Sequence, residues 1–81
     1  MTLVVYYFAA LRDLLGKSEE RLELAGPADV AALARLLTER YPQLGPHLGS
    51  VRFAINESFV DAAAPLASGD VVALIPPVTG G

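Results

Sequence analysis

The chain has 81 residues, of which 53% are hydrophobic, and its formal net charge is −3. This length predicts a single domain, and the absence of cysteine excludes disulfides, thiol nucleophiles and thiolate metal ligands. No cluster of basic residues is present to bind nucleic-acid phosphates, and the apolar run Leu3 to Leu11 is far shorter than the roughly 20 residues of a membrane span. Because the N-terminus also has no basic leader, we expect a cytoplasmic protein that binds neither nucleic acid nor membrane.

The first half of the chain predicts two strands and two helices. Residues 3–8 are apolar on both alternating faces, which is typical of a strand buried on both sides near the centre of a sheet. A short helix over residues 10–15 and a half-exposed strand over residues 20–24 follow, and the two strands are expected to pair. Asp29 is then predicted to cap a long helix, whose apolar residues repeat at three and four positions as far as Tyr41.

The second half predicts a loop and three further strands. Glycines and prolines in residues 43–50 favour a loop, and strands are predicted over 51–55, 58–60 and 71–75. One mixed sheet wrapped around one long helix is the most economical fold for this order, with the first and last strands parallel at its centre. This α+β arrangement is the β-grasp, or ubiquitin-like, fold, and we assign residues 1–75 to it.

The sequence offers no ordinary active site. His47, the only histidine, lies in the predicted loop with no second metal ligand near it, and no serine lies in a Gly-x-Ser-x-Gly motif. Acidic residues are spaced as solvated surface charges; they include Asp13, Glu19, Glu20, Glu23 and Glu39. We therefore expect no bound metal or cofactor and no independent enzymatic activity.

The most informative segment is the end of the chain, which reads Pro76-Pro77-Val78-Thr79-Gly80-Gly81. Because proline cannot donate to a sheet ladder, residues 76–81 are predicted to leave the sheet as an extended arm. The two final glycines have no Cβ, which suits entry into a narrow channel and leaves no side chain next to the Gly81 carboxylate. ATP can convert such a carboxylate to an acyl-adenylate, and sulfur supplied from outside can then replace AMP and leave a thiocarboxylate.

Nearly end to end, the chain resembles the small, sulfur-carrying subunits of molybdopterin synthase, a family of ubiquitin-like sulfur carriers. The residues that carry the resemblance are Pro65-Leu66, Gly69-Asp70, Val72-Ala73 and Pro76 through Gly81, with Phe8-Ala9, Leu11-Arg12, Gly16 and Asn56. A Gly-Gly end alone is shared by many carriers and modifiers, whereas the complete Pro-Pro-Val-Thr-Gly-Gly ending is typical of a much narrower group of proteins.

The resemblance implies a role for Gly81 in making the molybdenum cofactor. A ubiquitin-activating-like adenylyltransferase would use ATP to adenylate Gly81, which would become a thiocarboxylate and enter the large subunit of molybdopterin synthase. There it would donate sulfur to a pyranopterin precursor, within a heterotetramer whose catalytic groups belong to the large subunit.

The resemblance also implies which residues bind the partner. It places Phe8, Phe59 and Ile75 on the partner-binding surface, with an ion pair from Arg12, although core packing is an equally good interpretation for Phe8. The arm residues expected to contact the partner are Pro76, Pro77, Val78, Thr79 and Gly80.

Three alternatives remain open at this point. The first is a sulfur carrier of the same construction that serves thiamine synthesis or transfer-RNA thiolation. Such carriers usually lack the Pro-Pro-Val-Thr stretch. A protein modifier would form isopeptide bonds with lysines of target proteins. A plain β-grasp interaction module would keep its function after deletion of Gly80 and Gly81.

Overall fold

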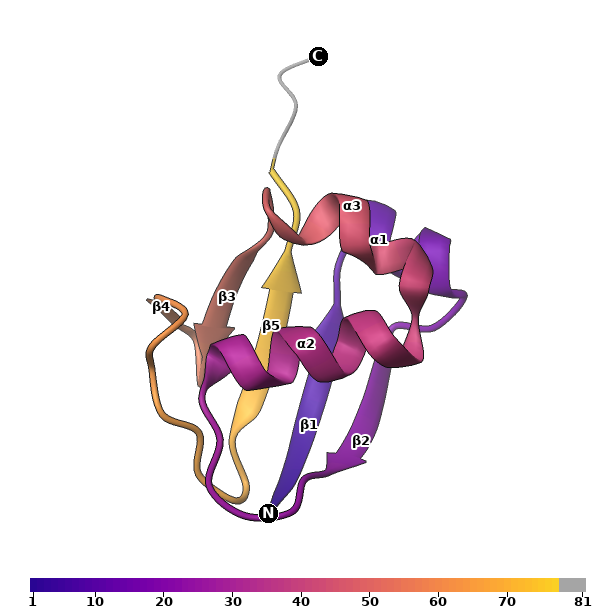
Figure 1. Cartoon of the computed structure of the whole chain (residues 1–81). Helices are drawn as coiled ribbons and strands as arrows, with labels where there is room; N and C mark the ends of the chain where they lie inside the picture. Colours follow the sequence, from indigo (N-terminus) through magenta and orange to yellow (C-terminus); the bar gives the residue numbers. More distant parts are fainter. Residues whose placement is uncertain (78–81) are drawn as a thin grey trace.

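The fold is a mixed five-stranded sheet with one long helix packed across one of its faces (Figure 1). The computed structural model describes residues 1–77 of the chain. In chain order, the strands are β1 (Thr2–Tyr7), β2 (Glu19–Glu23), β3 (Arg52–Ile55), β4 (Ser58–Val60) and β5 (Val71–Ile75). The helices are α1 (Ala10–Leu15), α2 (Val30–Arg40), the 3-10 turn η1 (Pro42–Leu44) and α3 (Gly45–Leu48).

The strand order β2-β1-β5-β3-β4 is that of the predicted β-grasp. The first and last strands, β1 and β5, are parallel neighbours, with Val5 opposite Val72. Parallel neighbours need a long crossover connection, which the chain between β1 and β5 supplies. The other pairs, β1 with β2, β3 with β4 and β3 with β5, are antiparallel, so the predicted pairing of the first two strands is confirmed.

The hydrophobic core lies between the sheet and α2. Asp29 caps α2 as predicted, because its Oδ1 accepts from the backbone N–H of Ala32 at 2.8 Å. Alternate residues of β1 and β5 face the helix and are fully buried, and each such side chain contributes about 1.5–3 kcal/mol to folding. The core side chains of β1, β5 and α2 are Leu3, Val5, Tyr7, Val72, Leu74, Val30, Leu33 and Leu37.

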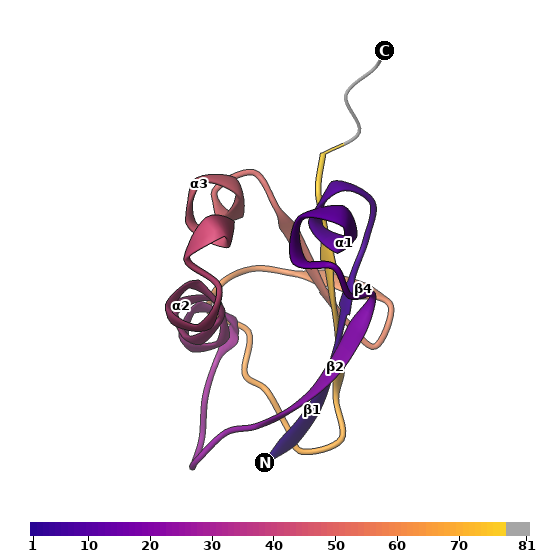
Figure 2. The ribbon, with the colours of Figure 1, turned by 90° about the vertical axis from the view of Figure 1, so that its right-hand side faces the viewer.

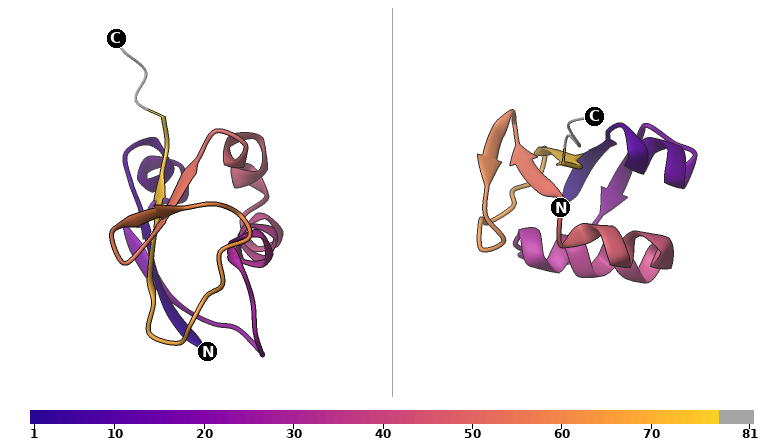
Figure 3. Two further views of the ribbon diagram at one scale, coloured as in Figure 1. Left: turned by 90° about the vertical axis from the view of Figure 1, so that its left-hand side faces the viewer. Right: turned by 90° about the horizontal axis from the view of Figure 1, so that it is seen from above.

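The opposite face of the sheet has no helix over it within residues 1–77 (Figures 2 and 3). The prediction that β1 is buried on both sides is therefore wrong, because Leu3, Val5 and Tyr7 are buried while Val4 and Tyr6 stay half-exposed. A chain this short has one long helix, which can cover only one side of its sheet.

The loop predicted over residues 43–50 is also wrong, since η1 and α3 occupy most of it. Pro42 and Pro46 lie in the first turns of these helical segments, where a missing N–H costs no hydrogen bond. Leu44 anchors the segment because its side chain is fully buried. His47 is exposed as expected, but it lies in α3 and not in a loop.

The remaining differences between prediction and structure are shifts of strand ends by one residue. The second strand covers 19–23, where 20–24 was predicted, and the third begins at Arg52, where Val51 was predicted. In residues 1–77, none of the helices has both the length and the apolar character needed to cross a bilayer.

Candidate functional site

The uncovered side of the sheet carries a continuous set of apolar side chains, which we call the open face. Its members are Tyr6, Phe8, Ala54, Phe59, Val71, Ala73 and Ile75, and together with Glu57 they line a hollow of about 340 Å³. Three of them are conspicuously exposed for their type: Phe8 at 46%, Phe59 at 55% and Val71 at 37%. Exposed apolar patches rimmed by polar residues mark sites of protein interaction.

The shape of the open face follows from the pairing of β3, β4 and β5. Ala54 lies between Phe59 on β4 and Ala73 on β5, so two small side chains sit side by side. Larger side chains surround these alanines, which makes the face concave. The ring centroids of Tyr6 and Phe8 lie 6.4 Å apart on the β1 side of this hollow.

Three of the four predicted partner-binding residues of the domain lie together. Phe8, Phe59 and Ile75 come from three different segments and line the same hollow. The exposure of Phe8 argues against its alternative role in core packing. Arg12 lies on α1 and not among the residues that line the hollow, and its Nε is 4.0 Å from Asp13 Oδ1 with both side chains largely exposed.

The arm begins where β5 ends, at the end of the sheet near α1 and α3 (Figure 1). Phe8 is joined to this end, because its backbone N–H donates to the carbonyl of Leu74 at 3.3 Å. Pro76 is half-buried and Pro77 is exposed, and both line a second hollow with residues of α1 and α3. The predicted site residues Val78, Thr79, Gly80 and Gly81 lie outside the described residues, so their roles stay predictions.

A polar cluster around Glu20 was not predicted from the sequence. The Glu20 side chain is only 13% exposed, so the expectation that it is solvated is wrong. Its carboxylate accepts from the Tyr7 hydroxyl and, at 2.8 and 2.9 Å, from the Tyr41 hydroxyl, which itself accepts from Lys17 Nζ at 2.8 Å. Lys17 Nζ and Arg40 Nη1 also lie 3.8 Å from Glu20 Oε1. This cluster joins β1, β2 and the C-terminal end of α2.

The cluster shifts the titration of two of its members. Burial raises the pKa of the Tyr7 phenol far above its ordinary value, and the hydrogen bond to Glu20 acts in the same direction. The hydrogen bond to Tyr41 raises the pKa of the Lys17 amino group. Both groups therefore stay protonated to a higher pH than usual, which fits a structural role for the cluster.

Comparison with known proteins identifies the family. The model of the ThiS family matches residues 5–81, which is nearly the whole chain. The chain belongs to the ThiS family. One relative is the molybdopterin synthase sulfur carrier subunit of Mycobacterium tuberculosis, which is 36% identical over 78 residues covering 95% of this chain and 94% of the relative.

Two solved structures of similar proteins extend the comparison. The complex of subunits 1 and 2 of molybdopterin-converting factor from Helicobacter pylori includes a chain that is 27% identical, with a TM-score of 0.71 and full coverage of both chains. The small archaeal modifier protein 1 of Methanosarcina acetivorans is 26% identical, with a TM-score of 0.84 over 99% of this chain and 96% of that one. The first is a two-subunit assembly, whereas the second is named as a modifier.

Proposed function

We propose that this protein is the sulfur carrier of molybdenum cofactor biosynthesis and acts in the cytoplasm as the small subunit of molybdopterin synthase. The observation that carries the proposal is the similarity, over nearly the whole chain, to a sulfur carrier subunit of that enzyme. The Pro-Pro-Val-Thr-Gly-Gly ending supports this pathway over thiamine synthesis and transfer-RNA thiolation, since carriers for those pathways usually lack the first four residues.

The reaction of the chain takes place at the Gly81 carboxylate. A ubiquitin-activating-like adenylyltransferase joins this carboxylate to AMP from ATP and releases pyrophosphate. A sulfur donor then replaces AMP, which leaves with one carboxylate oxygen, and Gly81 becomes a thiocarboxylate. The thiocarboxylate donates its sulfur to a pyranopterin precursor inside the large subunit. The chain has no cysteine that could attack its own activated end.

The open face supports this role because it provides a docking surface next to the arm. Phe8 and Ile75 lie at the end of β5 from which residues 76–81 continue, and Phe59 extends the same hollow toward β4. Pro76 and Pro77 have fixed φ angles, which reduces the entropy lost when the arm is bound. A large subunit that covers the open face would thus receive the arm in a defined direction.

Intact-protein mass spectrometry tests the first half of the proposal. The full chain and a chain lacking Gly81 are each incubated with the activating enzyme, ATP and a sulfide source. We expect the full chain alone to gain the mass difference between one sulfur and one oxygen atom. No gain, with an enzyme that loads a control carrier, would favour a plain interaction module.

The second half is tested by adding the large subunit and a pyranopterin precursor to the thiocarboxylated chain. Formation of the dithiolene, with return of the chain to its original mass, is the expected result. A thiocarboxylate that is stable in this mixture but consumed in a transfer-RNA or thiamine thiolation assay would assign the carrier to one of those pathways.

Protein modification is the second candidate, favoured by the similarity to a small archaeal modifier protein. It predicts isopeptide bonds between Gly81 and lysines of target proteins. Immunoblots of a lysate for conjugates that disappear when Gly81 is deleted distinguish this function from sulfur transfer.

A further inference from the structure

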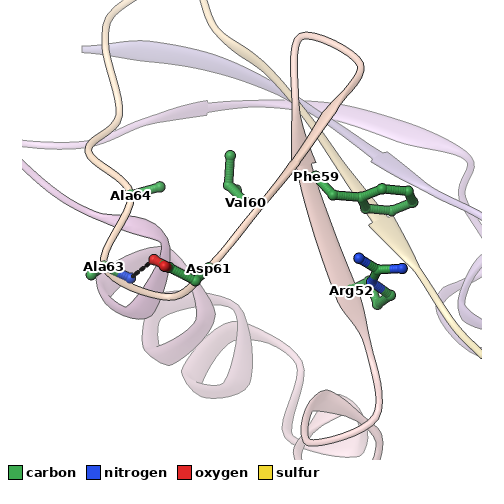
Figure 4. Close-up of a pocket in the computed structure, with 6 residues that line it drawn as sticks. All are labelled: Arg52, Phe59, Val60, Asp61, Ala63 and Ala64. Carbon is green, nitrogen blue, oxygen red and sulfur yellow. Dashed lines mark hydrogen bonds between the residues drawn. The ribbon is translucent and has the colours of Figure 1, made fainter.

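Arg52 lies at the β3 side of the open face and stacks on one of its aromatic residues. Its Cζ is 3.9 Å from the centroid of the Phe59 ring, and Figure 4 shows the guanidinium and the ring one above the other. Arg52 also pairs with Ile75 across β3 and β5, so it adjoins the last residue of β5. The cation therefore belongs to the rim of the open face, close to where the arm begins.

The guanidinium of Arg52 has no ion-pair partner among residues 1–77. Arg52 and Phe59 line a shallow pocket that also includes Asp61 (Figure 4). The Asp61 carboxylate makes no ion pair with Arg52; its Oδ1 accepts from the backbone N–H of Ala63 at 2.9 Å. The β2 side of the open face carries one charge of each sign, since β2 places Glu19 beside Tyr6 and Arg21 beside Val4. Arg52 is thus a cation stacked on an aromatic ring, and its guanidinium donates to no acceptor in the described part of the chain.

A stacked guanidinium is well suited to bind a carboxylate. Its planar group presents two parallel N–H donors that match the two oxygens of an aspartate or glutamate. Stacking on Phe59 restricts the side chain before binding, so less entropy is lost when the pair forms. A partner that covers Phe59 also removes water from the Arg52 guanidinium, and this cost is recovered only if the partner supplies an anion.

We propose that Arg52, stacked on Phe59, binds an aspartate or glutamate of the synthase large subunit that docks on the open face. This inference rests on the proposed function, because it names the chemistry of the surface that meets the carrier. It makes Arg52 a determinant of partner specificity, since a partner with an apolar or basic group at this place would leave the buried cation unpaired.

The test is the affinity of the full chain for the large subunit, measured by calorimetry at low and high salt. Arg52→Met keeps an apolar side chain against Phe59 and removes the charge and the donors. Arg35→Met is the control, because Arg35 is an exposed arginine of α2 and is not among the residues that line the hollow of the open face. It shares a separate hollow with Arg52. Phe59→Ala is measured in parallel to test docking itself.

We expect Arg52→Met to raise the Kd about tenfold or more at low salt, with a smaller factor at high salt where charges are screened. Arg35→Met should leave the Kd within about twofold of the original at both salt concentrations. Replacing the partner's carboxylate by its amide should abolish the effect of Arg52→Met, which identifies the acidic residue.

Other outcomes separate this inference from the proposed function. If Phe59→Ala weakens binding and Arg52→Met does not, the open face is the docking surface and the role of Arg52 is refuted. A loss with Arg52→Met that does not depend on salt would mean that Arg52 only supports the Phe59 ring, which also overturns the proposal. No binding of the original chain would refute both.

Discussion

Removing the Glu20 carboxylate is expected to destabilise the fold, although sequence alone classes Glu20 as a surface charge. In Glu20→Ala, the Tyr7 and Tyr41 hydroxyls lose their acceptor. A hydrogen bond to a charged group contributes about 1.5–3 kcal/mol, and water can only partly replace a side chain that is 13% exposed. The ion pairs at 3.8 Å to Lys17 and Arg40 add little to this, because both cations are substantially exposed and their charges are screened by water.

We therefore expect Glu20→Ala to lower the free energy of unfolding by about 2–4 kcal/mol. For a domain of this size the melting temperature should fall by about 10–25 °C. Glu20→Gln keeps one acceptor oxygen and should cost about 1 kcal/mol, so the two variants form a graded series.

Urea unfolding followed by circular dichroism measures these changes, and the slope with urea shows whether the unfolded state is altered. Glu19→Ala is the control because Glu19 is the neighbouring glutamate of β2 and is exposed; its effect should stay within about 0.5 kcal/mol. Equal stability of the Glu20→Ala and Glu19→Ala variants would refute the reasoning, because it would show that the cluster contributes no net free energy.

Three further predictions concern pH, docking and the arm. The stability of the fold should decrease above about pH 10, because the unfolded chain then releases the Tyr7 proton while the raised pKa keeps it bound in the folded chain. Tyr7→Phe should make this decrease shallower in urea titrations repeated across alkaline pH, and an unchanged slope would exclude Tyr7 as its source. Phe59→Ala should weaken binding of the large subunit about tenfold or more, while the melting temperature changes little because the ring is 55% exposed; a large loss of stability would show that the ring supports the fold. Deletion of Gly81 should abolish thiocarboxylate formation and leave the melting temperature unchanged, since β5 already ends at Ile75; a lower melting temperature by calorimetry would mean that the end of the arm is packed.

Local patterns were sufficient to predict most of the secondary structure. The spacing of apolar residues, with Asp29 as the cap, located α2, and an apolar run after turn residues located β5 at its correct bounds. These signals depend on neighbours within one turn or one strand, so they can be read without knowing the fold. The helices η1 and α3 were missed because Pro42 and Pro46 break a helix interior but also begin helices.

The Pro-Pro-Val-Thr-Gly-Gly ending is likewise a property of the sequence. The chemistry proposed for it belongs to the terminal carboxylate of Gly81, which needs no other residue of the chain to define it. The resemblance to sulfur carriers depended mainly on this segment, and the family match over residues 5–81 confirms that relationship.

Tertiary structure alone decided which apolar residues form the core and which form the open face. Both faces of β1 and β5 are apolar, so alternation cannot tell the covered face from the uncovered one; the position of α2 does. The same holds for contacts between residues distant in sequence. Glu20 meets Tyr41 across 21 positions, and Arg52 meets the Phe59 ring because a hairpin brings β3 and β4 together. Such contacts depend on how the elements pack, which is why a glutamate that the sequence places among surface charges becomes the largely buried centre of a polar cluster.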